Sequence, residues 1–111
     1  MKINKKNALK LWEEHYGNRW YAKDFHGNLM LRDAYDDTDC DRMNHFGLEC
    51  YGWNLHHILP KKCGGTNAKS NLICTAIPTN EAASDKTTFW IEGCLYQVHK
   101  YEEGYEIERI G

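Results

Sequence analysis

The sequence of 111 residues lacks the apolar segments that membrane insertion or export requires. It contains no run of about eighteen apolar residues, which is the length that a membrane-spanning helix needs. Its first ten residues, MKINKKNALK, lead into a charged segment instead of the apolar region of a secretory signal. We therefore expect no membrane association and a cytoplasmic location.

Cysteine pairs of the C-x-x-C type are also missing. The number of cysteines, five, is odd, which argues against a disulfide framework. The missing pairs argue against a zinc site of four thiolates, so a structural metal domain is the weakest functional interpretation. We expect reduced, mostly buried small apolar side chains. The cysteines are Cys40, Cys50, Cys63, Cys74 and Cys94.

The third feature that is lacking is an excess of basic residues. The formal net charge is -2 and the isoelectric point is near 6.3. A domain that binds nucleic acid mainly by neutralising phosphates is more basic than this. If DNA is the ligand, a local basic patch or a metal ion must supply the attraction.

The two ends of the chain carry regular patterns around a central stretch. The length fits a single domain, 1–111, with one core. Asn7–Tyr16 has the apolar spacing of an amphipathic helix, which Asn7 can cap and Gly17 can end. Residues 19–31 alternate between apolar and polar around the turn His26-Gly27-Asn28, which predicts a β-hairpin.

Residues 87–110 are rich in aromatic and β-branched residues with two Glu-Gly turns, which predicts a β-meander. His99 lies in its middle strand, and we assign it no role. The fold class that follows is α+β.

An acidic segment, Asp33–Asp41, contains five aspartates without periodicity. It is typical of a solvated loop, and a cation or partner site is the alternative. Arg42 stands where a calcium-binding EF-hand needs glycine, and no glutamate closes the loop, so calcium is disfavoured. Gly47 and Gly52 indicate bends after this segment.

The central stretch, 53–86, reads as strand, polar loop, strand and helix. The first strand ends before Pro60, and Gly64-Gly65 allow a tight reversal in the loop. Residues 71–75 form the second strand, and the helix covers about Thr79 to Asp85, with Thr79 as a cap.

Paired imidazoles give this stretch its chemistry. Because alternate side chains of a strand face opposite sides, His56 and His57 can do two different jobs. A helix that crosses the strands would bring Asn80 near both. One imidazole, one amide oxygen and water oxygens make an open site for a divalent metal, and the second imidazole is a candidate general base.

The order of these residues resembles that of a known family. His56-His57-Ile58-x-Pro60, Gly64-Gly65, Asn71-Leu72 and Asn80 occur in the order of the HNH endonuclease signature, in the form whose last ligand is asparagine. The resemblance covers 53–86 and implies a ββα-metal motif, here with an N-terminal helix and hairpin and a C-terminal meander.

The resemblance also implies roles. His57 would activate the attacking water, Asn71 would fix the loop and the His57 backbone, and His56 and Asn80 would hold one divalent metal ion. The reaction would be hydrolysis of DNA phosphodiester bonds to a 5′ phosphate and a 3′ hydroxyl, as an endonuclease or nickase.

Two positions depart from the family pattern. His56 stands where most members have aspartate, which shifts the metal from magnesium toward manganese, nickel or zinc, because imidazole suits the softer ions. Ala83 stands where related sequences often have lysine, so either the activity is weaker than is usual in the family or the role of that lysine has moved, for example to Lys86, Lys61 or Lys62. We expect phosphate contacts from Lys61, Lys62, Lys69 and Lys86.

A protein of another class is the alternative. An HNH-like protein with little activity could bind a protein partner, for example as a phage-encoded inhibitor of a host defence nuclease. The net acidity and the Asp33–Asp41 segment, which could imitate phosphates, favour it. Both alternatives allow a monomer or a homodimer.

Overall fold

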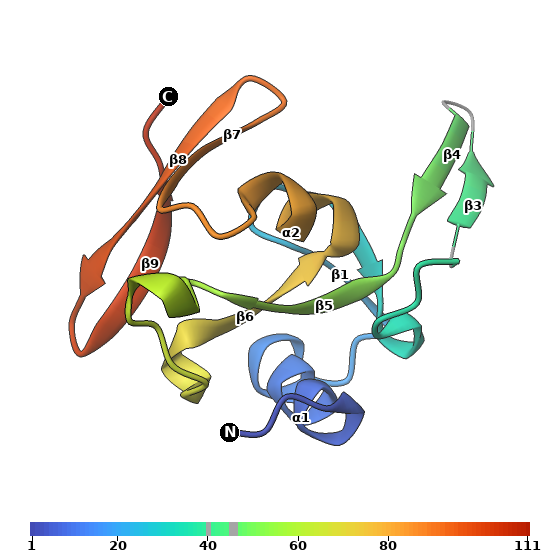
Figure 1. Ribbon diagram of the computed structural model, residues 1–111. Coiled ribbons are helices and arrows are strands. Elements are labelled where there is room, and N and C mark those ends of the chain that lie inside the picture. The colour runs from blue at the N-terminus through green and yellow to red at the C-terminus, as the bar shows by residue number, and fades with distance from the viewer. Residues whose placement is uncertain (40, 45–46) are drawn as a thin grey trace.

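The computed structural model describes residues 1–39, 41–44 and 47–111, with side chains outside 40–50. Within these residues it is a small α+β protein, as expected from the sequence, with two α-helices and four antiparallel sheets (Figure 1). Helices α1 and α2 lie on opposite sides of the β5–β6 ribbon, and the three-stranded sheet stands at one end of it.

Helix α1 covers Lys5–Tyr16 and begins two residues earlier than predicted. The predicted cap was wrong: Asn4 is the N-cap, and its side chain accepts a hydrogen bond of 2.9 Å from the backbone N–H of Asn7. The predicted end is confirmed, because Gly17 has a φ of 66° and its N–H closes the last turn onto Glu13. The helix buries Ala8, Leu11 and Trp12.

Two hairpins follow α1. Strands β1, Tyr21–Lys23, and β2, Leu29–Leu31, confirm the first hairpin. A short 3-10 turn, Arg32–Ala34, leads to a second hairpin that the sequence did not predict. It consists of β3, Asp41–Asn44, and β4, Gly47–Cys50. The bend predicted at Gly47 is confirmed, because Asn44 and Gly47 are the closing pair of this hairpin and the chain reverses direction between them.

Gly52 lies where the chain enters the central stretch. A Cβ atom at this position would stand 2.0 Å from the backbone oxygen of Asp37, so only glycine fits there. The close approach places the acidic loop directly against the start of β5.

The central stretch forms a long hairpin followed by a helix. Strand β5, Trp53–His57, pairs antiparallel with β6, Leu72–Ala76, and α2, Ile77–Ala83, follows at once. The connecting loop contains the short 3-10 turns Lys61–Cys63 and Lys69–Asn71. The predicted strand, loop, strand and helix are confirmed in order, with the helix starting two residues early.

The meander is confirmed in the C-terminal part of the chain. Its strands are β7, Thr88–Ile91, β8, Cys94–Tyr101, and β9, Gly104–Arg109. They pair antiparallel in this order. Glu92 and Glu102, in the tight turns, have positive φ values of 48° and 52°.

Most of the buried apolar residues that the structure describes form two clusters instead of the single expected core. The larger cluster joins α1 to the β5–β6 hairpin through Trp12 and Trp53, whose ring centroids lie 4.9 Å apart. Each buried indole N–H donates to a backbone oxygen, that of Arg19 and that of Arg32 respectively. The smaller cluster joins α2 to the meander and contains Ala83, Phe89, Ile91 and Tyr96.

The cysteines with described side chains are free, and only one of these three is fully buried. Cys74 is buried, Cys94 is half-buried and Cys63 is exposed. The side chains of Cys40 and Cys50 lie outside the described residues. Among the described residues, no helix has the length and apolar character to cross a membrane.

Candidate active site

An open cleft of about 350 Å³ lies between β5, the loop that follows it and α2. Both imidazoles of the predicted site and the predicted helix asparagine line it. The lining residues that carry polar side chains are His56, His57, Lys61, Lys62, Asn80, Ser84 and Asp85.

His56 and Asn80 face each other across the cleft. Nδ1 of His56 lies 2.6 Å from Oδ1 of Asn80, and Nδ2 of Asn80 donates to Oδ1 of Asn54 at 2.7 Å. The predicted approach of α2 to His56 is therefore confirmed. An amide oxygen only accepts, so Nδ1 of His56 is the donor and Nε2 carries the lone pair.

The environment of His56 keeps its ring neutral. Burial lowers the pKa of His56 from 6.5, the hydrogen bond to Asn80 opposes this, and the nearby His57 lowers the pKa further. Metal ligation requires neutral imidazole, so this environment favours it.

The donor atoms fit a divalent ion. In the hydrogen bond, one proton holds Nδ1 of His56 and Oδ1 of Asn80 together, and a cation that replaced this proton would meet both atoms. Nε2 of His56 is buried and has no hydrogen-bond partner among the described residues. No hydrogen bond at Nε2 therefore fixes the ring proton on Nδ1. Two protein ligands leave several coordination positions for water and substrate oxygens.

His57 takes a different partner from His56, which confirms that the two rings diverge. Its Nε2 lies 2.7 Å from Oδ1 of Asn67, a loop residue that the sequence reasoning missed. Because the amide oxygen accepts, Nε2 of His57 is the donor, and Nδ1 is left as the basic nitrogen of the neutral ring. Asn80, expected near both rings, bonds only to His56 among the described histidines.

Asn71 is buried and holds the loop between the strands. Its Oδ1 accepts from the N–H of Leu59 at 2.8 Å, and its Nδ2 donates to the backbone oxygens of Leu59 and Thr66. Its own backbone oxygen accepts from Ile58. Asn71 thus grips the backbone one and two residues beyond His57.

Gly65 completes this arrangement. A Cβ atom there would lie 1.8 Å from the oxygen of Leu59 and 2.9 Å from Nδ2 of Asn71. Glycine is needed at position 65 because the loop backbone there passes directly against the backbone oxygen of Leu59 and the amide of Asn71.

The structure separates the four lysines proposed to contact phosphates. Lys61 and Lys62 line the cleft, whereas Lys69 and Lys86 are not among its described lining residues. Lys62 Nζ lies 3.1 Å from Asp85, and its hydrogen bond and charge lower the pKa of that carboxyl. Lys69 pairs with Glu14 of α1 at 2.8 Å.

Ala83 faces the protein interior. It is fully buried in the smaller apolar cluster. A lysine here would need to bury its charge, so the packing of α2 on the meander explains why this chain has alanine at this position.

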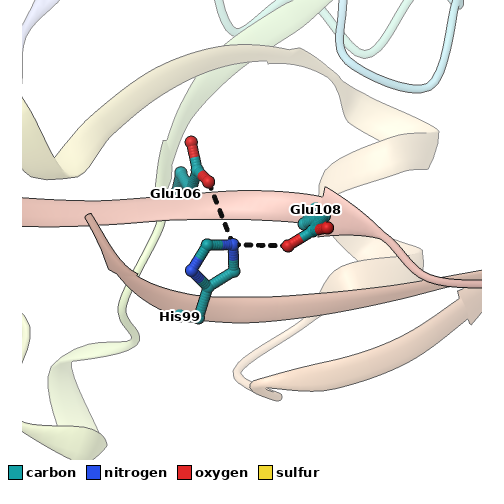
Figure 2. Close-up of side chains that lie close together, drawn as sticks. All are labelled: His99, Glu106 and Glu108. Atoms are coloured by element: carbon teal, nitrogen blue, oxygen red, sulfur yellow. Dashed lines mark ion pairs between the residues drawn. The ribbon is translucent and has the colours of Figure 1, made fainter.

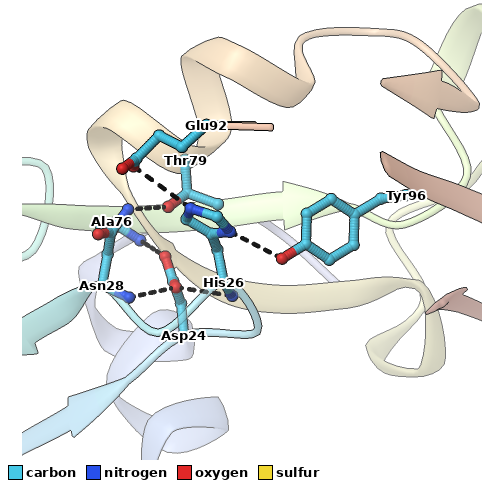
Figure 3. Close-up of polar contacts among 7 residues, drawn as sticks. All are labelled: Asp24, His26, Asn28, Ala76, Thr79, Glu92 and Tyr96. Atoms are coloured by element: carbon cyan, nitrogen blue, oxygen red, sulfur yellow. Dashed lines mark hydrogen bonds and ion pairs between the residues drawn. The ribbon is translucent and has the colours of Figure 1, made fainter. Parts of the chain in front are cut away.

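A polar network that the sequence reasoning missed holds the N-terminus of α2 (Figure 3). The buried carboxylate of Asp24 accepts from the N–H groups of His26, Asn28 and Ala76 at 3.0, 2.9 and 2.9 Å. Ala76 is the N-cap of α2, and it offers no capping side chain.

The same network corrects the predicted helix cap. Thr79 is buried inside the first turns of α2, and its hydroxyl accepts from Nδ2 of Asn28 at 2.8 Å. Pro78 lies in the first turn, as predicted. The first hairpin therefore performs the capping that the helix sequence lacks.

His26, in the turn of the first hairpin, links this hairpin to the meander. Its Nδ1 lies 2.7 Å from the hydroxyl of Tyr96, and its Nε2 lies 3.3 Å from Glu92 (Figure 3). An aspartate two residues before the turn His26-Gly27-Asn28 is a sequence signal for the local Asp24 bonds. The sequence has no signal for the contacts to α2 and the meander.

Comparison with protein-family models, with curated proteins and with solved structures finds no match.

Proposed function

We propose that this protein is a metal-dependent endonuclease of the HNH type, in which β5, β6 and α2 form the ββα-metal motif and DNA is the substrate. One observation carries the proposal. An imidazole from β5 and an amide from α2 face each other at 2.6 Å in an open cleft that a second imidazole also lines. This pairing supplies a metal site and a neighbouring base.

His57 acts as the general base. Its Nε2 donates to Asn67, so Nδ1 accepts the proton of the attacking water. Asn67 is a positioning residue, since it selects this tautomer. Asn71 fixes the turn that follows His57 by its bonds to Leu59.

His56 and Asn80 hold the divalent metal, and manganese, nickel or zinc suits this ligand pair better than magnesium. When bound, the metal stabilises the charge that develops on the scissile phosphate and on the leaving 3′ oxygen. Lys61 and Lys62 contact the flanking phosphates, and Lys62 exchanges its ion pair with Asp85 for one with DNA. The products carry a 5′ phosphate and a 3′ hydroxyl.

Nicking of supercoiled plasmid tests this proposal. Wild type, His57→Ala and His15→Ala are compared with Mg²⁺, Mn²⁺, Ni²⁺ and Zn²⁺. Loss of a general base costs about 10²–10⁴-fold in rate, so His57→Ala should lose nicking by this factor. His15, an exposed imidazole of α1, is the matched control and should retain activity. Equal background-level cutting by all proteins in every metal would refute the proposal.

Metal binding by Asn67→Ala, measured beside cleavage, distinguishes a role of Asn67 in positioning His57 from a role in folding the loop. Asn67→Ala should slow cleavage, because the ring of His57 is no longer held in one tautomer, but it should bind metal as wild type does. A variant that loses metal binding and cleavage together would instead indicate that the loop has collapsed.

Exposed acidic side chains favour the protein-binding alternative. Asp36, Asp37 and Asp39 are all exposed in the loop before β3, so this loop presents negative charge to solvent. This alternative predicts that replacing the three aspartates with asparagine abolishes inhibition of a partner nuclease and that His57→Ala has no effect on it.

A further inference from the structure

A second group of side chains that can bind a metal lies on the meander (Figure 2), and none of the three lines the cleft. His99 on β8 stands opposite Glu106 on β9, and Glu108 follows two positions further along the same strand. Alternation places the two glutamates on one face. Nε2 of His99 lies 3.0 Å from Oε1 of Glu106 and 2.7 Å from Oε2 of Glu108.

The other ring nitrogen of His99 fixes the tautomer. Nδ1 lies 3.2 Å from the backbone oxygen of Lys100, which can only accept, so Nδ1 is the donor. In the neutral ring the lone pair is therefore on Nε2, and it faces two carboxylates that also only accept. Three acceptor atoms at this distance require a cation among them, either a proton or a metal ion.

The directions of these contacts favour the metal. Nε2 of His99 is buried and makes no hydrogen bond within the described part of the chain, although both carboxylate oxygens lie within hydrogen-bond distance. The oxygens therefore flank the axis of the nitrogen instead of lying on it. A zinc ion about 2.1 Å from each atom would lie on this axis, and its tetrahedral geometry would hold nitrogen and oxygen about 3.4 Å apart, so each carboxylate oxygen would need to move outward by only about 0.4–0.7 Å.

We propose that His99, Glu106 and Glu108 bind a divalent transition metal, with zinc as the preferred ion because imidazole and carboxylates both suit it. The bond of Nδ1 to a backbone oxygen orients the ring, as metal-bound histidines commonly require. The ion would join β8 to β9. This site shares no ligand with the pair His56 and Asn80, and it does not depend on nuclease activity.

Zinc titration of the full chain with a competing fluorescent chelator tests the inference. His99→Gln should bind one zinc equivalent fewer than wild type, and Glu106→Gln/Glu108→Gln should lose the same equivalent. His15→Gln, which removes an exposed imidazole of α1, is the control and should bind as wild type does. Wild-type circular dichroism in the variants would show that the meander is intact.

The zinc titration tests the meander site independently of the proposed site at His56 and Asn80. An equivalent that His99→Gln removes and His56→Ala retains supports the meander site, whatever the result of the plasmid assay. If His99→Gln binds as many equivalents as wild type, or if wild type binds no zinc, the inference is overturned and the group is an ion pair alone. His99→Gln should nick plasmid at the wild-type rate.

Discussion

Replacing Asp24 with asparagine should destabilise the protein strongly, although the side chain keeps its shape. The carboxylate accepts two N–H groups at Oδ1 and the buried N–H of Ala76 at Oδ2. Asparagine keeps one oxygen, so an NH₂ group must face at least one N–H. The variant loses a charge-assisted hydrogen bond and leaves a buried donor without an acceptor, which together cost about 2–4 kcal/mol.

Urea denaturation followed by tryptophan fluorescence measures this cost, because Trp12 and Trp53 are buried in the larger cluster. Asp33→Asn is the matched control, since Asp33 is exposed and the same change there should stay within about 0.5 kcal/mol of wild type. If Asp24→Asn also stays within this range, the carboxylate does not hold α2 and the reasoning fails.

Three further predictions concern single side chains. Asn71→Ala should lower the free energy of unfolding by about 2–4 kcal/mol, because three hydrogen bonds of a buried amide are lost; a shift of the urea midpoint within error would contradict this. Burial raises the pKa of Cys74 to about 12, so iodoacetamide should alkylate the exposed Cys63 and spare Cys74 in peptide mass spectrometry of the native protein. Because burial lowers the pKa of His56 from 6.5, the unfolded chain binds more protons below that pH, and stability should fall as the pH drops from 6.5 through the lowered pKa. The free energy of unfolding, measured by urea denaturation across this pH range, should fall less steeply with decreasing pH for His56→Gln than for wild type.

The sequence predicts the elements whose signals are local. Gly17 ends α1 through its own left-handed conformation, and the Glu-Gly turns of the meander fix where each strand begins and ends. In the same way, Pro78 indicates the first turn of α2. Each signal acts within a few residues, so no knowledge of tertiary contacts is needed.

Predictions from the sequence failed where one residue type allows two structures. Asn4 and Asn7 can both cap a helix, and only one does. Thr79 has the chemistry of a cap, but a side chain 51 residues away satisfies it instead. Such choices depend on contacts that have no local pattern.

In the candidate site too, the contact that follows from the order of the elements was predictable and the contact that depends on the path of a loop was not. The proximity of His56 and Asn80 follows from a hairpin with a helix packed against it, so the order of elements was enough to predict it. The partner of His57 was not predictable, because Asn67 lies in a loop whose path depends on Asn71 and on the close packing at Gly65.

The position of Asn80 depends on residues outside the cleft. Helix α2 has seven residues and no capping side chain of its own, and so short a helix is not stable by itself. Asp24 and Asn28 hold its first turn from the β1–β2 hairpin. Because Asn80 lies one turn further along, a change at this hairpin would move the amide relative to His56. The first hairpin is therefore a structural determinant of the proposed metal site, although the side-chain hydrogen bonds of the two proposed ligands, within the described residues, go to other parts of the chain.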